Sequence, residues 1–293
     1  MFLQHGRAYH GCVRKGAAQS GPVFALVYLL AFAALAGACA PQGPVERAQQ
    51  LVRLHREPEA LSTLRDHLAK HPEDIPARRL YVRVLAFTGD IDGARREVAE
   101  LEKRMPNDPV PWIELGHAFE LAHRFDEALA AYDTAASVAP ASPAGPREGG
   151  MRAARWGESE EAASRLEEAV RRGARDAETF HVLGLARLNL RDLSGAEEAY
   201  KQGLAANPKS TENLLGLATV AVVRDDAAAA LAAYDAIAVE KPSYAAAQLG
   251  RAWALAKLGR KAEAERALDR AAELGAPAVN VDKQRKAIRS GAL

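Results

Sequence analysis

The stretch PVPWIELGHAFELAHRFDEALAAYDTAASVAPAS, residues 109–142, decides the fold of this chain. Apolar residues recur in it every three or four positions, first over residues 110–122 and again over residues 125–138. This spacing is typical of amphipathic helices. Pro140 follows the second run, and proline ends a helix because it cannot continue the backbone hydrogen bonding. The stretch therefore predicts a hairpin of two helices.

The same pattern recurs every 34 residues along most of the chain. Counted from Pro41, it forms seven units with no insertion: 41–74, 75–108, 109–142, 143–176, 177–210, 211–244 and 245–278. Position 20 of the seven units is always alanine: Ala60, Ala94, Ala128, Ala162, Ala196, Ala230 and Ala264. Position 8 is Gly, Ala or Val, position 24 is Leu, Val or Tyr, and position 32 is proline in five units. Such a period indicates stacked hairpins, because one hairpin alone cannot bury its apolar face.

These columns resemble the signature of the tetratricopeptide repeat (TPR) family. The unit 109–142 carries the signature residues Trp112, Leu115, Gly116, Phe119, Ala128, Tyr132, Ala135 and Pro140. The resemblance implies an all-α protein, a right-handed TPR α-solenoid of about seven hairpins with a concave inner surface. The polar stretch 279–293 is expected to form a capping helix and tail. A solenoid of this family implies a protein that binds other proteins.

Composition and motifs argue against most other functions. The 39 Lys and Arg nearly balance the 38 Asp and Glu, so no overall charge attracts nucleic acid. The only cysteines are Cys12 and Cys39, which excludes a disulfide framework and a zinc-ligand cluster. We find no catalytic motif and expect no cofactor and no small-molecule substrate. His67 and His71 lie four residues apart, which leaves two interpretations: a metal site of a hydrolase, or two incidental surface histidines.

The N-terminus looks like a targeting segment. A basic stretch that ends at Lys15 is followed by an apolar run from Pro22 to Ala38, and residues 1–38 therefore predict a signal peptide. The sequence before Cys39 resembles a bacterial lipobox, which implies lipidation of Cys39 and a short linker over residues 39–44. Several acyl chains would anchor the protein stably in a membrane. Ala40 after the cysteine favours the outer membrane.

The lipobox match is incomplete. The residue three positions before Cys39 is Ala36, where the pattern usually has leucine. Ala36-Gly37-Ala38 also fits ordinary signal-peptide cleavage. A soluble secreted protein and an uncleaved anchor therefore remain alternatives to a lipoprotein.

In TPR proteins the first helix of each hairpin lines the groove, chiefly through positions 2, 5, 9, 12 and 13. The resemblance therefore implies these candidate groove residues: Arg79, Arg83, His117, Arg147, Arg155, Leu185, Leu215, Leu249 and Trp253. The groove would be basic in its N-terminal half and apolar in its C-terminal half, which suits a peptide with an acidic part and an apolar part. Alternatively, the final helix buries the apolar residues. Ile113 and Glu114 stand where a carboxylate clamp for chaperone tails would need amide or basic groups.

Two units depart from the pattern. The first has Arg47 where a core leucine is expected, so we expect this terminal unit to act as a cap. The fourth carries Pro143, Gly145, Pro146, Gly149 and Gly150 in its first helix. We expect this helix to start late, with Pro146 in its first turn. The fourth unit is then either a repeat that has drifted in sequence or a hinge between units 1–3 and 5–7.

The sequence thus favours a non-catalytic adaptor anchored in a bacterial envelope. By analogy with TPR pilotins, it would assist the assembly of an outer-membrane complex such as a type IV pilus secretin. A second possibility is an adaptor for enzymes that process peptidoglycan, and a third is a soluble secreted binding protein.

Overall fold

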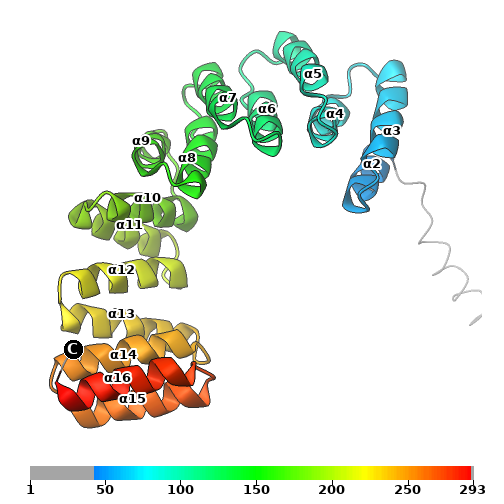
Figure 1. Ribbon diagram of the computed structural model, residues 1–293. Coiled ribbons are helices and arrows are strands. Elements are labelled where there is room, and N and C mark those ends of the chain that lie inside the picture. The colour runs from blue at the N-terminus through cyan, green and yellow to red at the C-terminus, as the bar shows by residue number, and fades with distance from the viewer. Residues whose placement is uncertain (1–42, 292–293) are drawn as a thin grey trace, which may run out of the picture.

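The computed structural model describes residues 43–291, and this part of the chain contains fifteen α-helices and no β-strand (Figure 1). In chain order the helices are α2 (Pro44–Arg53), α3 (Glu57–Lys70), α4 (Ile75–Phe87), α5 (Ile91–Arg104), α6 (Val110–Leu121), α7 (Phe125–Val138), α8 (Ala144–Trp156), α9 (Ser159–Arg171), α10 (Ala177–Asn189), α11 (Leu193–Ala206), α12 (Thr211–Val223), α13 (Ala227–Glu240), α14 (Ala245–Lys257), α15 (Lys261–Glu273) and α16 (Ala278–Ser290). The predicted all-α architecture of seven hairpins and a final helix is confirmed.

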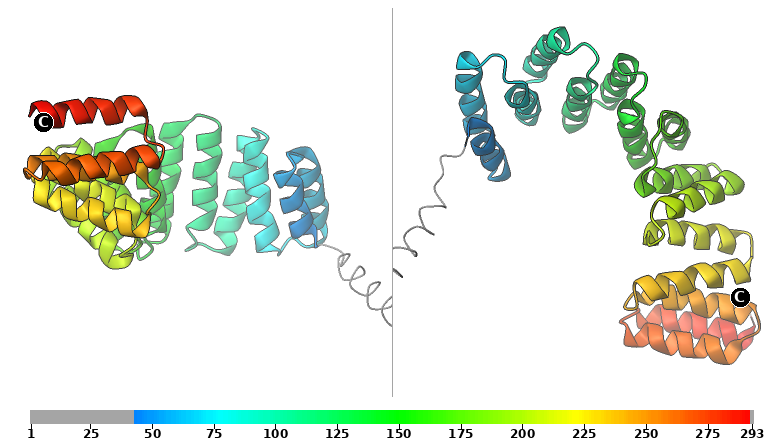
Figure 2. Two further views of the ribbon diagram at one scale, coloured as in Figure 1. Left: turned by 90° about the horizontal axis from the view of Figure 1, so that it is seen from below. Right: turned by 180° about the vertical axis from the view of Figure 1, so that it is seen from behind.

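The hairpins stack into a curved array. We call the first helix of each hairpin helix A and the second helix B. Helices pack within a hairpin and against those of the neighbouring hairpins, with no extensive contact between hairpins further apart in the described chain. Figure 1 shows α4, α6 and α8 on the inner side of the arc and α5, α7 and α9 on its outer side. The two views of Figure 2 show that the array also turns along its length.

The ends of the helices are set by short polar residues and by tight turns. Six helices begin after a side chain that accepts a hydrogen bond from the backbone N–H three residues on: Asp74, Asp90, Asp176, Asp192, Ser210 and Asp226. Each such cap typically stabilises a helix by about 1 kcal/mol. Between the helices of every hairpin, position 15 has a positive φ of 55° to 88°. The sequence provides glycine there in three hairpins, whereas the other four have non-glycine residues that adopt this conformation at some steric cost: His55, His123, Arg191 and Asp225.

The core follows the repeat columns. All seven alanines at position 20 are fully buried. The side chains at position 24 lie between hairpins, and the rings of Tyr132 and Tyr200 show why glycine occurs at position 8. A Cβ added to Gly116 would lie 2.5 Å from the ring of Tyr132, and one added to Gly184 would lie 2.5 Å from the ring of Tyr200. Small residues at this column therefore leave room for a large one at position 24.

The fourth hairpin differs from what the sequence suggested. Its first helix, α8, begins at Ala144, as early as the other A helices, so the expected late start is wrong. Pro146 does lie in the first turn, where its missing N–H costs no hydrogen bond. The glycines serve packing: a Cβ on Gly145 would lie only 2.5 Å from the backbone nitrogen of Ala136 in α7. Close approach of α7 and α8 thus accounts for Gly145 without a hinge.

The two ends of the array are closed differently. At the C-terminal end, α16 packs on α14 and α15 and buries Val281 and Ile288. The remainder of α16 is largely polar, as expected for a capping helix. At the N-terminal end, α2 and α3 bury Ala48, Leu51, Ala60, Leu64 and Leu68 on one side, and Arg47 is exposed.

The predictions of a signal peptide and of a lipidated Cys39 lie outside the described residues. Within residues 43–291, every helix is too short or too polar to cross a membrane.

Candidate functional site

A pocket of about 440 Å³ opens between the A helices α8 and α10, in the middle of the array. Its lining residues are Arg147, Glu148, Met151, Arg152, Ala154, Arg155, Glu178, Val182 and Leu185. Three of the predicted groove residues, Arg147, Arg155 and Leu185, therefore come together in one place. Figure 1 shows α8 on the inner side of the arc, which is the side that the sequence predicted for binding.

One side of this pocket is apolar. Met151 and Ala154 of α8 and Val182 of α10 are partly buried there, whereas the side chain of Leu185 is 41% exposed. An exposed leucine beside other apolar side chains offers a surface that a ligand's apolar group could cover.

The other side of the pocket carries arginines in different states. Arg152 is bound by two acids, with its Nε 2.7 Å from Glu120 Oε2 and its Nη2 3.4 Å from Glu148 Oε2. In contrast, Arg155 is 66% exposed, and its guanidinium approaches Glu120 only to 3.6 Å. Arg155 is thus the cation of this pocket that a ligand's carboxylate can reach at the least cost.

Arg147 closes the pocket toward the start of α10. Its Nη2 lies 2.7 Å from Glu178 Oε2 and 3.1 Å from Asp176 Oδ1, and its Nε donates to Thr179 Oγ1 at 2.9 Å. Burial by itself raises the pKa of Asp176, but the hydrogen bonds from Arg147 and Thr179 outweigh it and lower that pKa to about 2. Arg147 therefore holds two hairpins together, besides lining the pocket.

The pKa of Glu148, an acid that lines the pocket, is also lowered. A hydrogen bond with His117 lowers the pKa of Glu148, against the opposing effect of burial, and the nearby Arg152 lowers it further. His117 also lies 3.2 Å from Arg152 Nη2. His117 is therefore part of an ion network between α6 and α8 and is not an isolated groove residue.

The predicted basic half of the groove consists largely of ion pairs. Arg79 pairs with Asp108. Arg83 donates two hydrogen bonds to Glu114, from Nε to Oε2 at 2.7 Å and from Nη2 to Oε1. Glu114 is almost completely buried. Arg83 thus links the second hairpin to the third, and Arg79 is bound to the segment that connects them. A ligand would have to displace these acids to reach the two arginines.

The predicted apolar half is partly covered. Leu249 and Trp253 are half-buried against a cluster that includes Val281 and Ile288 of α16, and Gln284 of α16 donates a hydrogen bond to the Leu249 carbonyl at 2.9 Å. Leu215 packs beside Leu214 and Ile237. The alternative interpretation, in which the final helix buries apolar groove residues, therefore describes Leu249 and Trp253 well. Leu185 is the most exposed of the four predicted apolar groove residues.

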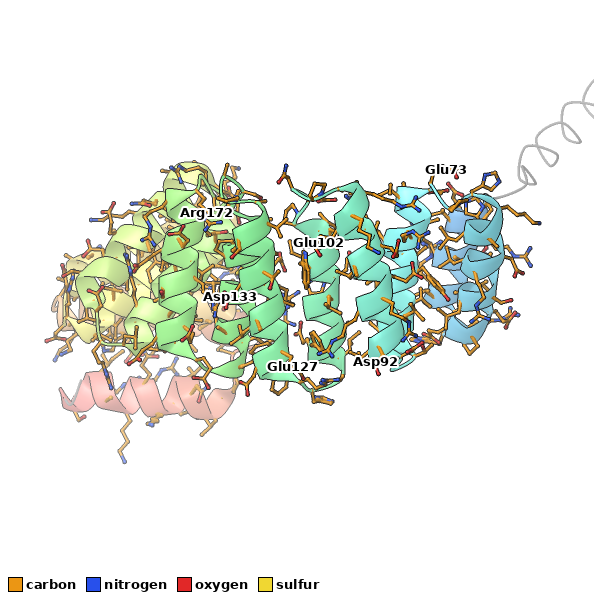
Figure 3. The ribbon with its side chains drawn as sticks, turned by 90° about the horizontal axis from the view of Figure 1, so that it is seen from above. Glu73, Asp92, Glu102, Glu127, Asp133 and Arg172 are labelled. Atoms are coloured by element: carbon orange, nitrogen blue, oxygen red, sulfur yellow. The ribbon has the colours of Figure 1, made fainter. Side chains whose placement is uncertain are left out.

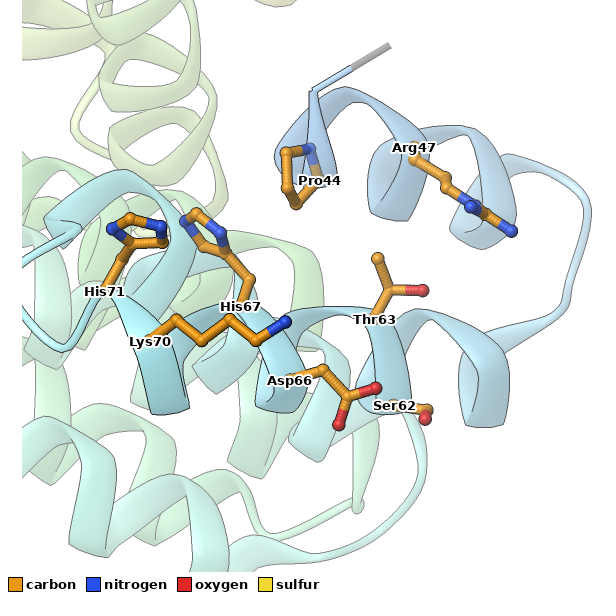
Figure 4. A pocket seen from close by; sticks show the side chains of 8 residues that line it. All are labelled: Pro44, Arg47, Ser62, Thr63, Asp66, His67, Lys70 and His71. Atoms are coloured by element: carbon orange, nitrogen blue, oxygen red, sulfur yellow. The ribbon is translucent and has the colours of Figure 1, made fainter. Parts of the chain in front are cut away.

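His67 and His71 lie at the N-terminal end of the array, in a wide pocket of about 520 Å³ between α2 and α3 (Figure 4). Their rings are 4.8 Å apart, and His67 Nε2 lies 2.7 Å from Asp74 Oδ2. No group of three His, Cys, Asp or Glu side chains among residues 43–291 is placed to hold a metal ion. The pocket is lined mainly by polar side chains at the end of the solenoid, as a capping repeat requires.

The sequence analysis missed the acids that partner the groove arginines. The arginine and acid of the pairs Arg83–Glu114, Arg147–Glu178 and Arg152–Glu120 lie 31 or 32 residues apart. Such a separation is close to one repeat, so it places the partners on neighbouring A helices. A search for opposite charges about one repeat apart would have found them.

Comparison with known proteins gives the same class of fold. A family model described as tetratricopeptide repeat matches residues 51–113, and a second with the same description matches residues 148–211 and 215–279. These matches cover most of the chain, and the protein belongs to the tetratricopeptide repeat family. No curated protein matches it.

Several solved structures are similar. The C-terminal part of a TPR protein from Cytophaga hutchinsonii is 15% identical with a TM-score of 0.64, over 82% of this chain and 98% of that one. YrrB, described as a TPR protein with an unusual peptide-binding site, is 19% identical with a TM-score of 0.58, over 64% of this chain and 97% of that one. A MamA protein is 21% identical with a TM-score of 0.54, over 57% of this chain and 91% of that one. At these identities the likeness concerns the fold.

Proposed function

We propose that this protein is a non-catalytic scaffold that holds a polypeptide partner against the pocket between α8 and α10. The observation that carries the proposal is the meeting of an exposed cation, Arg155, with an exposed apolar side chain, Leu185, in one concave pocket. Membership of the TPR family supports it, and the similar YrrB is described as having a peptide-binding site.

The chemistry of the pocket suggests how a partner would be recognised. A carboxylate of the partner would pair with Arg155, and an apolar side chain nearby in the partner would cover Leu185 and Val182. The apolar contact would supply most of the affinity, and the charge would fix orientation. The sequence predicted that an acidic and apolar peptide binds along the whole groove. We propose that such a peptide binds at this one pocket.

Two variants test the site. We expect Arg155→Glu and Leu185→Asp each to reduce recovery of the main partner by about tenfold when the tagged protein is purified from detergent-solubilised envelopes and its companions are quantified by mass spectrometry. Both positions are exposed, so the fold should persist, which circular dichroism would check. Arg171→Glu and Val239→Asp change exposed positions away from the pocket and serve as controls. Unchanged recovery in the two pocket variants would refute the site.

We further propose that the scaffold acts in a bacterial envelope as a lipoprotein anchored through Cys39, and that it assists assembly of an outer-membrane complex of the secretin type. The apolar run before Cys39 and the layout of an anchor followed by a solenoid support this proposal. An adaptor for peptidoglycan-processing enzymes and a soluble secreted protein are the alternatives. Cys39→Ser should move the protein from the membrane fraction to the soluble fraction, and the co-purified proteins would distinguish a secretin from a hydrolase.

A further inference from the structure

The outer side of the array contains a repeated gap. Each A helix has a face that lies between its own B helix and the B helix of the preceding hairpin. In four hairpins an arginine lies in this gap and pairs with an acid. The four pairs are Arg78–Glu97, Arg165–Asp133, Arg187–Glu167 and Arg251–Asp235. The four arginines come from different repeat positions (4, 23, 11 and 7), yet each lies in the same kind of gap. In the seventh hairpin a smaller, polar pocket of about 180 Å³ remains beside Arg251.

In the third hairpin this gap is open. A groove of about 350 Å³ runs between α5 and α7 above α6. Its lining residues are Arg95, Ala99, Trp112, Leu115, Phe119, Glu127, Ala130, Ala131 and Thr134. Figure 3 views the molecule from this outer side, with Glu127 labelled beside the groove. The guanidinium groups of Arg95 and Arg124 lie 4.9 and 5.0 Å from the ring centre of Phe119, so cations border the apolar floor.

The sixth hairpin has a second open gap at the same repeat positions. This groove, of about 280 Å³, lies between α11 and α13 above α12. Its lining residues are Glu197, Lys201, Leu214, Leu217, Val220, Ala221, Arg224, Asp226, Ala229, Ala232, Ala233 and Ala236. The two grooves are three repeats apart.

Both grooves have a smooth, uncharged wall. At repeat positions 22, 23 and 26 the third hairpin has Ala130, Ala131 and Thr134, and the sixth has Ala232, Ala233 and Ala236. In the second, fourth, fifth and seventh hairpins at least one of these positions is charged. The charges at the mouths are already paired within the protein: Arg95 with Glu127 at 2.9 Å, and Arg224 with Glu197. An occupant would therefore need to bring apolar groups and no net charge.

We propose that these two outer grooves are docking sites for an amphipathic helix of a partner protein. A helix satisfies its own backbone hydrogen bonds, whereas an extended segment would leave part of its backbone unpaired against apolar walls. Small wall residues allow a helix to approach closely, at interaxial distances of about 8–10 Å. The ten-residue span from Asp226 to Ala236 is about 15 Å long, enough for apolar side chains at i, i+4 and i+7 of the partner.

Other occupants fit less well. Acidic residues near the groove of the third hairpin, including Asp92 and Glu102 on α5 and Asp133 on α7 (Figure 3), offset the arginines at its border. Arg95 and Arg124 are both already paired with Glu127, so they do little to attract an anionic lipid surface. Each described helix of this chain exposes at most one large hydrophobic side chain, so a second copy has no exposed apolar stripe to insert. This inference concerns the outer face and does not depend on the concave pocket.

A spectroscopic titration tests the inference on the third hairpin. With Trp156→Phe and Trp253→Phe, Trp112 becomes the only tryptophan and reports on the groove from within. The probe is a synthetic 14-residue helix of leucine, alanine and glutamine with leucines at i, i+4 and i+7. We expect saturable changes in Trp112 emission, and binding weaker by about tenfold for a peptide of the same composition with the leucine spacing scrambled.

An ion pair of the fourth hairpin suggests substitutions that should close the groove. Ala99→Asp with Ala131→Arg places the Arg165–Asp133 pair of the fourth hairpin at the same positions of the third, and should weaken binding of the probe by about tenfold or more. Because Ala131 is buried, Ala130→Lys at the exposed mouth provides a second blocking variant, and Ser137→Arg, on α7 outside the groove, is the control.

Four results would overturn the inference. Both blocking variants could keep full affinity, or the scrambled peptide could bind as well as the helix. Trp112 could respond equally to neutral phosphatidylcholine vesicles, which would indicate a membrane surface. Sedimentation could show self-association that the blocking variants abolish, which would indicate a second copy of the chain.

Discussion

At the scale of single residues, Gly145 is required because two backbones meet there. Gly145→Ala places a Cβ 2.5 Å from the backbone nitrogen of Ala136, so we expect it to destabilise the protein by about 1–3 kcal/mol despite the better helix propensity of alanine. Gly149→Ala in the same helix is the control, because its nearest neighbour would be the Tyr132 Cβ at 3.2 Å. Its effect should stay within about 1 kcal/mol. Urea unfolding of the two variants measures the difference, and equal stability would contradict the close-packing argument.

Asp176 caps the first turn of α10 and pairs with Arg147, so its contribution to folding stability depends on pH. Its pKa is lowered to about 2 in the folded protein, compared with about 3.9 in an unfolded chain. The stabilisation it provides is therefore fully present above pH 4 and is lost as the pH falls toward 2. Asp176→Ala should cost about 1 kcal/mol or more at pH 7, because it also removes the helix cap.

The pH dependence distinguishes the stabilisation that comes from the charge of Asp176 from the stabilisation that comes from its helix cap. Asp176→Asn keeps a capping oxygen and loses the charge, so it should be less destabilised than Asp176→Ala at pH 7. Melting temperatures at pH 7, 4 and 2 measure both effects. A gap between wild type and Asp176→Asn that stays constant down to pH 2 would show that the ionised carboxylate contributes nothing.

At the scale of helices, ion pairs on the inner face connect one hairpin to the next. Glu114 is almost fully buried on α6 and depends on Arg83 of α4 for its partner. Arg83→Ala leaves this carboxylate unpaired and should cost about 1–3 kcal/mol. The double variant Arg83→Ala with Glu114→Gln should recover part of that loss, because the unpaired charge is gone. Chemical denaturation of the wild type, Arg83→Ala, Glu114→Gln and the double variant completes a double-mutant cycle. Purely additive losses of stability would count against the pairing.

The same reasoning guides how ligand binding should be probed. A charge reversal at Arg79 or Arg83 would break a connection between hairpins, so weaker binding could reflect a damaged array. Arg155 avoids this problem because it is exposed and only loosely associated with Glu120. It is the better position for testing a role in recognition.

The junction around α8 offers a further prediction. A hinge between the third and fifth hairpins would show as fast amide exchange in α8. The backbone contact between Gly145 and Ala136 predicts instead that α7, α8 and α10 exchange at similar rates in hydrogen–deuterium exchange measured by mass spectrometry. A clear protection minimum confined to α8 would restore the hinge interpretation.

The helices could be predicted from the sequence because their signals are local or strictly periodic. The alanines at position 20, the prolines that end units and the capping aspartates each act within one hairpin. The start of α8 was wrongly predicted because glycine was judged by its helix propensity, whereas Gly145 is explained by a neighbour in another helix. Three of the predicted groove residues, Arg147, Arg155 and Leu185, line one pocket. The acids that pair with the groove arginines were not predicted, because they come from neighbouring hairpins.

At the scale of the whole molecule, stability depends on closing the two ends of the stack. Ile288 of α16 is 2% exposed and packs on the last hairpin. Ile288→Ala should cost about 2–5 kcal/mol, whereas Val279→Ala, at an exposed position of the same helix, should change stability by less than about 0.5 kcal/mol. Thermal unfolding measures both. A similar effect of the two substitutions would mean that α16 does not cap the array.

The pattern of contacts has a mechanical consequence. In the described chain each hairpin touches mainly its immediate neighbours, and the ion pairs of the inner face span a single junction. A pull on the two ends is therefore shared among six junctions between hairpins, each of which can open by a small angle while its helices stay intact. The solenoid can therefore lengthen elastically without unfolding. A partner bound along it would be carried with the hairpins as the junctions open, while both proteins stay folded.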